Sequence, residues 1–165
     1  MTEPLVTYLN DHLGGAQIAI QVLEAMRDQH DEENFREFAM AMLREVQSDD
    51  RTLRSIAEKI GPGPSTLKAA AGWVVEKLSR LKLGHTGTAD FEMFESLEML
   101  ALGIQGKLSL WKALRAASAM DPRLSEYNFA ELIRRAEEQY KMVEGHRLTL
   151  AQTVLAPQTL DEEAK

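Results

Sequence analysis

Ionisable side chains at core-facing positions are the residues of this sequence with the clearest chemical potential. Apolar residues at helical spacing define one buried face on each long predicted helix. Those faces also carry four acidic residues and one histidine, namely His12, Glu45, Asp49, Glu98 and Glu144. Carboxylates and imidazole are ligands for iron, manganese and zinc. These five residues therefore form a candidate metal site, with one or two ligands from each of four helices.

Two other interpretations of the same residues involve no metal. Carboxylates and an imidazole can form a buried polar layer in which they satisfy one another. Alternatively, Glu98 and Glu144 lie at the solvated edge of their helices. His12 and Asp49 lie about equally far from the turn that joins their helices, so they are expected to face each other. Among these interpretations, we expect the metal-free polar layer.

Five helices would position these residues, and the spacing of apolar residues predicts all five. They cover residues 4–28, 32–60, 65–81, 89–120 and 129–155, followed by a polar tail at 157–165. The segment Gly61-Pro62-Gly63-Pro64 ends the second helix. Asn128 and Glu131 have the spacing of a capping box at the start of the last helix. The chain is predicted to be one all-α domain, residues 1–165.

The first helix contains an unfavourable feature, the pair Gly14-Gly15. Glycine inside a helix costs about 1 kcal/mol relative to alanine, so a structural reason for the pair is expected. Close packing against a neighbouring helix is one such reason. The predicted buried face of this helix passes beside the pair and consists of Leu5, Leu9, His12, Ala16, Ala19, Leu23 and Met26.

The lengths of the connections predict how the helices are arranged. Short turns join helix 4–28 to helix 32–60, and helix 89–120 to helix 129–155, so each pair is expected to form an antiparallel hairpin. About 28 residues, including the predicted helix 65–81, join the two hairpins, which is long for a bundle connection. One long crossover gives a ferritin-like four-helix bundle. An up-and-down bundle with an extra peripheral helix is the alternative.

Three segments resemble an uncharacterised bacterial branch of the ferritin-like superfamily: YLNDHL at 8–13, EKLSRLKL at 76–83 and GKLSLWKAL at 106–114. The resemblance covers about residues 4–155 and implies a ferritin-like bundle with a long crossover. A ferritin-type di-iron site takes one glutamate from each of two helices and a Glu-x-x-His pair from each of the other two. This chain departs from that pattern, because helices 32–60 and 129–155 contain no Glu-x-x-His. Glu144-Gly145-His146 has the wrong spacing to replace it.

The resemblance and this departure together predict a bundle of unassigned biochemical role, as an interaction or stress-associated protein rather than a competent ferroxidase. The alternative is a metal-binding protein of the di-iron oxidoreductase type that uses the five candidate residues. No catalytic residue and no organic cofactor is predicted.

Composition argues against several other classes of protein. The net charge of −7, from 26 acidic and 19 basic residues, disfavours nucleic-acid binding. The chain has no cysteine, which removes thiolate sites. No apolar stretch reaches the ~20 residues of a membrane helix, and the N-terminus lacks a signal-peptide pattern, so we expect a cytoplasmic protein.

Helix 32–60 carries apolar residues around more than half of its circumference, which predicts a homodimer. No other protein partner is indicated.

Overall fold

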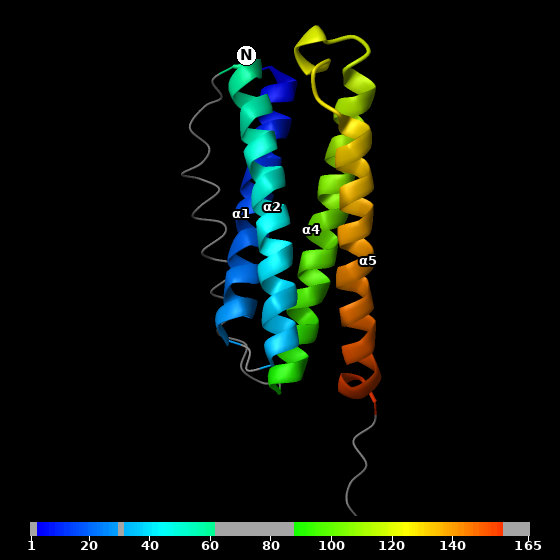
Figure 1. Ribbon diagram of the computed structural model, residues 1–165. Coiled ribbons are helices and arrows are strands. Elements are labelled where there is room, and N and C mark those ends of the chain that lie inside the picture. Colours follow the sequence, from blue (N-terminus) through cyan, green and yellow to red (C-terminus); the bar gives the residue numbers. More distant parts are fainter. Residues whose placement is uncertain (1–2, 30–31, 62–87, 157–165) are drawn as a thin grey trace, which may run out of the picture.

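The computed structural model describes residues 3–29, 32–61 and 88–156. Its long helices are α1 (Pro4–Gln29), α2 (Glu33–Ile60), α4 (Ala89–Ala117) and α5 (Phe129–Val154), and the short 3-10 helix η1 (Pro122–Leu124) precedes α5 (Figure 1). The prediction of an all-α chain is confirmed, since these residues contain no strand. The helix bounds lie close to the predicted ones, although α4 ends at Ala117 rather than Met120. The predicted helix 65–81 lies outside the described residues.

The long helices pack as two hairpins. α1 lies against α2, and α4 lies against α5, as the short connections predict (Figure 1). α1 also packs against α4 and so joins the two hairpins. The start of α5 is capped as expected, because the Asn128 side chain accepts a hydrogen bond from the Glu131 backbone amide at 3.1 Å.

Arg123, in η1, links the two hairpins at one end of the bundle. Its guanidinium donates to the Glu3 carboxylate at 2.7 Å and to the Ile60 carbonyl at 3.4 Å. It also donates to Asp121 at 2.7 Å. The start of α1, the end of α2 and the α4–α5 turn therefore share this end. It follows that α2 and α4 run in the same direction, with Ile60 and Ala89 at opposite ends of the bundle (Figure 1).

The apolar core is divided into two clusters along the bundle. One lies toward Arg123 and includes Leu9, Ile56 and Trp111. The other lies toward the α1–α2 turn and includes Leu23 and Leu97. α1 contributes to both clusters but has no fully buried residue from position 14 to position 21. Of the predicted buried face of α1, Leu9, Leu23 and Met26 are buried, whereas Leu5, His12, Ala16 and Ala19 are only half-buried.

Candidate functional site

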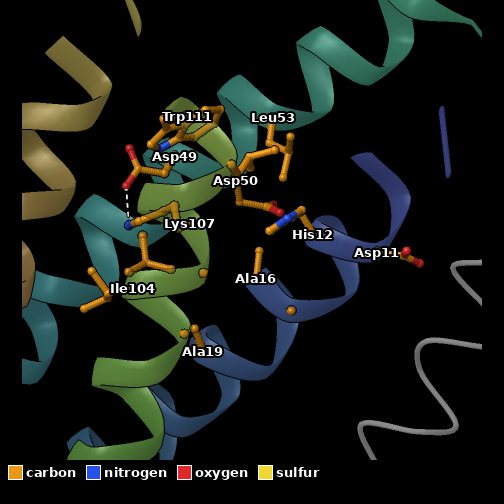
Figure 2. Close-up of a pocket in the computed structure, with 15 residues that line it drawn as sticks. Asp11, His12, Ala16, Ala19, Asp49, Asp50, Leu53, Ile104, Lys107 and Trp111 are labelled. Atoms are coloured by element: carbon orange, nitrogen blue, oxygen red, sulfur yellow. Dashed lines mark hydrogen bonds and ion pairs between the residues drawn. The ribbon is translucent and has the colours of Figure 1, made fainter. Parts of the chain in front are cut away.

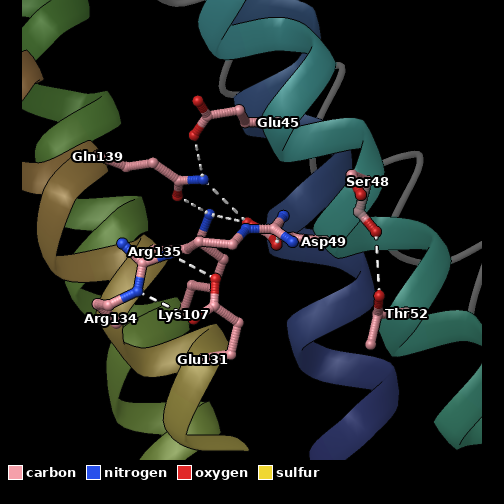
Figure 3. A network of polar contacts seen from close by, with 9 residues as sticks. All are labelled: Glu45, Ser48, Asp49, Thr52, Lys107, Glu131, Arg134, Arg135 and Gln139. Carbon is pink, nitrogen blue, oxygen red and sulfur yellow. Dashed lines mark hydrogen bonds and ion pairs between the residues drawn. The ribbon is translucent and has the colours of Figure 1, made fainter. Parts of the chain in front are cut away.

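A network of buried and half-buried charged and amide side chains lies between the two apolar clusters. We call it the polar layer, and it consists of Glu45, Asp49, Lys107, Arg135 and Gln139 (Figure 3). Asp49, which is 2% exposed, is its centre. The Asp49 carboxylate accepts from the Lys107 ammonium at 2.6 Å, from the Gln139 amide at 3.2 Å and from the Arg135 guanidinium.

Gln139 connects the second carboxylate of the layer to the first. Its amide nitrogen also donates to Glu45 at 2.9 Å, while its carbonyl oxygen accepts from Lys107. The side chain is fully buried, and both ends of its amide are thus satisfied, as buried polar groups require. Helical spacing places it there, because Ala136 and Val143, one turn away on either side, are buried too.

The charges of the polar layer balance. Glu45 and Asp49 supply two negative charges, and Lys107 and Arg135 supply two positive ones. Burial lowers the pKa of the Lys107 amine, and the neighbouring Asp49 carboxylate opposes part of that decrease. The layer is therefore a self-neutralising arrangement rather than a cluster of carboxylates that requires a cation.

The five candidate metal ligands are not brought together. Glu98 and Glu144 share Arg147, whose guanidinium lies 3.1 Å from the first carboxylate and 2.7 Å from the second. The Glu98 side chain is 53% exposed. These two acids therefore lie at the solvated edge of their helices. Within the described ranges, no three histidine or acidic side chains are grouped so that they could hold a metal ion.

The remaining candidates separate into two neighbouring environments. Glu45 and Asp49 belong to the polar layer, whereas His12 lies on α1 with its ring edge-on to Tyr8, 4.7 Å between ring centroids. Burial lowers the pKa of His12, and the nearby Asp11 opposes that shift. His12 and Asp49 do line one cavity, as their equal distance from the turn suggested. The Asp49 carboxylate, however, is engaged by the layer.

That cavity is a pocket of about 190 Å³ between α1, α2 and α4 (Figure 2). Its walls include Gly15 and Ala16 from α1, Asp50 from α2, and Gly103, Gly106 and Trp111 from α4. It lies at the level of the polar layer, because Asp49 and Lys107 contribute to both. Its lining is mostly apolar. Ala19 also lines it, so three residues of the α1 stretch that has no fully buried residue face this pocket.

The glycines of the pocket are not contact points between helices. A Cβ atom added at Gly15, Gly103 or Gly106 would meet no atom of the described residues within 4 Å. The expectation of close packing at Gly15 is therefore wrong. Gly15 and Gly103 are exposed and Gly106 is half-buried, so the pocket wall is open at these positions.

The buried polar groups in the pocket wall differ in whether they have a hydrogen-bond partner. The Asp50 carboxylate is already paired, since it accepts from Arg54 at 2.8 Å and from Gln17 at 3.3 Å. Trp111 is fully buried, and its indole Nε1 has no hydrogen-bond partner among the residues that the structure describes. An unsatisfied buried donor is uncommon in a native protein.

Comparisons with known proteins identify no relative: the chain matches no family model, no curated protein and no solved structure. The ferritin-like resemblance of the three short segments therefore gains no support from them. In the helices that the structure describes, no segment is long and apolar enough to span a membrane.

Proposed function

We propose that this protein is a helical bundle that binds a small molecule in the pocket between α1, α2 and α4. The observation that carries the proposal is the mostly apolar pocket of about 190 Å³, whose walls also contain three glycines. Gly15, Gly103 and Gly106 lie inside long helices, where alanine would favour the helix by about 1 kcal/mol at each position. Each has room for a Cβ atom among the described residues. Gly145, outside the pocket, shares both properties, so the glycines agree with the proposal but do not carry it.

The other properties of the pocket agree with a binding role. A mostly apolar cavity with a few convergent polar groups is the usual form of a ligand site. This pocket is formed by both hairpins, since α1 and α2 come from one and α4 from the other. A bound molecule would contact both and would stabilise the folded bundle by mass action.

The arrangement of the helices supports a further proposal about ancestry. Two antiparallel hairpins with α2 and α4 in the same direction correspond to a ferritin-like bundle with one long crossover. In this interpretation the polar layer occupies the mid-bundle position where ferritin-like proteins hold metal. Its balanced charges support the metal-free alternative and an interaction or binding role rather than ferroxidase chemistry.

The proposed function can be tested with two neutral ring compounds, indane and 1-indanone, by calorimetric titration of the full chain. We expect at least one of them to bind and to raise the thermal unfolding midpoint. Gly106→Leu places a side chain in the pocket wall and should abolish binding. Gly145→Leu is the matched control, because Gly145 lies on α5 outside the pocket and also has room for a Cβ atom.

A failure of both compounds to bind would contradict the proposal. So would equal loss of binding in Gly106→Leu and Gly145→Leu, because a general effect of leucine on the bundle would then explain the result. Circular dichroism of both variants checks that each remains helical.

A further inference from the structure

The size of the pocket limits the ligand to a small molecule. An apolar cavity of about 150 Å³ accommodates benzene in another protein. The present pocket, at about 190 Å³, is somewhat larger. A ring compound of about eight to ten non-hydrogen atoms therefore matches it.

His12 is a polar group of the pocket wall that is still available for hydrogen bonding. It lines the pocket from α1 and is half-buried (Figure 2). Its ring contacts Tyr8 edge-on, with 4.7 Å between ring centroids, but neither ring nitrogen has a hydrogen-bond or ion-pair partner within the described ranges. Both nitrogens also keep accessible surface, because they are not among the fully buried side-chain atoms without a partner. The imidazole is therefore open to a hydrogen bond with a bound molecule.

The other polar side chains at the inner wall are engaged or out of reach. The Lys107 ammonium donates to the Asp49 carboxylate at 2.6 Å. The Asp50 carboxylate is paired with an arginine of α2 at 2.8 Å. Nε1 of Trp111 has no partner among the described residues, but this atom is fully buried and a ligand in the pocket does not touch it. The specific polar contact of a ligand is therefore expected at His12.

The charges of the wall favour a neutral ligand. Burial lowers the pKa of His12 from its ordinary value, although Asp11 opposes the shift, so the imidazole is neutral at neutral pH. An anion would lie among three carboxylates, those of Asp11, Asp49 and Asp50, and a single ammonium, that of Lys107. A cation would lose its hydration although the two buried carboxylates already have basic partners, and such burial is costly.

A hydroxyl group is the neutral group that matches His12 best. A neutral imidazole has one N–H donor and one nitrogen that accepts. A hydroxyl both donates and accepts, so it can bond to whichever ring nitrogen faces it. A carbonyl oxygen only accepts, and it therefore requires that the N–H of the ring faces the ligand.

We infer that the ligand of this pocket is a neutral, mostly apolar ring compound with one hydroxyl group, and that this hydroxyl forms a hydrogen bond with His12. This inference rests on the proposed binding function and adds the chemical class of the ligand to it.

The test compares 5-indanol with indane, which share one ring skeleton and differ by a hydroxyl group. In the native protein 5-indanol should bind about three- to ten-fold more tightly, the ratio expected for one net hydrogen bond. His12→Phe removes both ring nitrogens and keeps an aromatic ring beside Tyr8. In this variant the preference for 5-indanol should disappear, while indane binding reports that the pocket is intact.

His146→Phe is the matched control, because His146 is also half-buried but lies on α5, outside the pocket. This variant should keep the native preference for 5-indanol. A preference that persists in His12→Phe, or that is lost equally in both variants, would overturn the role of His12. Should His12→Phe fail to fold, His12→Leu replaces it, because leucine also lacks a hydrogen-bonding group.

The outcomes distinguish this inference from the proposed function. If 5-indanol and indane bind the native protein equally, the inference about the hydroxyl is wrong while the binding function stands. If neither binds, the proposed function itself fails. The amine 2-aminoindane, a cation at neutral pH with the same ring skeleton, tests the charge argument. Tighter binding of this amine than of 5-indanol would overturn the neutral class.

Discussion

Removal of the Asp49 carboxylate is the sharpest test of the polar layer. Asp49→Ala would leave Lys107 and Arg135 without the carboxylate that both engage. Breaking a buried ion pair by deleting one partner typically costs about 3–5 kcal/mol. The Lys107 side chain is only 15% exposed, whereas that of Arg135 is 27% exposed and has better access to water. We therefore expect a loss near the lower limit, about 3 kcal/mol.

The loss should be measured by urea unfolding, followed by circular dichroism, with the slope of the transition compared between variants. Glu98→Ala is the matched control, because it removes a carboxylate whose side chain is 53% exposed and that pairs with Arg147. Surface ion pairs contribute little, so this variant should remain close to the native protein. Equal stabilities of Asp49→Ala and Glu98→Ala would refute the idea that the layer is an internally paired unit around the buried Asp49.

Three further predictions concern the glycines, one histidine and metals. Gly15→Ala and Gly145→Ala should each stabilise the bundle by about 0.5–1 kcal/mol in thermal unfolding. A lower stability of Gly15→Ala alone would indicate that the space beside Gly15 is occupied. Burial against Phe38, with ring centroids 4.1 Å apart, lowers the pKa of His146. The unfolded chain therefore takes up this proton first, and stability should fall as the pH drops below about 6.5. Unfolding of His146→Gln should show a smaller decrease over the same range, and an identical pH profile would contradict this assignment. Titration with iron, manganese or zinc should leave the unfolding midpoint unchanged, whereas stabilisation by ~2.7 kcal/mol at a hundred times the dissociation constant would support a metal site.

The helices of this protein are predictable from the sequence because their signals are local. Apolar spacing, the Asn128 cap and the Gly-Pro breaks all act within a few residues of the positions they define. Asp49 is predictable in the same way, since it lies on one helical face with Val46 and Leu53, and all three are buried. The existence of a buried polar residue in α2 thus follows from α2 alone.

The partners of Asp49 do not follow from α2 alone. Lys107 and Gln139 come from the other hairpin, and their meeting depends on how far the hairpins slide and rotate against one another. A signal exists nevertheless, because Lys107 lies three residues after Ile104 and four before Trp111, both buried. Lys107 and Gln139 are overlooked when only acidic residues and histidine are considered as polar residues of the core.

The position of Glu98 is ambiguous because α4 has apolar residues on every side. Leu100 is buried, whereas Leu102 is 69% exposed. On such a helix the apolar pattern does not fix which side faces the core. A small error in rotation is then sufficient to move Glu98 from the core to the edge, where Arg147 binds it.

The polar layer also determines how the two hairpins align along the bundle axis. Apolar packing is non-directional, and the nearest alternative alignment of the hairpins is a shift of one helical turn, about 5.4 Å. Such a shift would move Asp49 away from Lys107 and Arg135 and would place buried charges against aliphatic side chains. Buried polar contacts are known to specify alignment in this way in coiled coils. The polar layer therefore specifies the axial register of the two hairpins, because its ion pairs form in one alignment and are broken in the neighbouring ones.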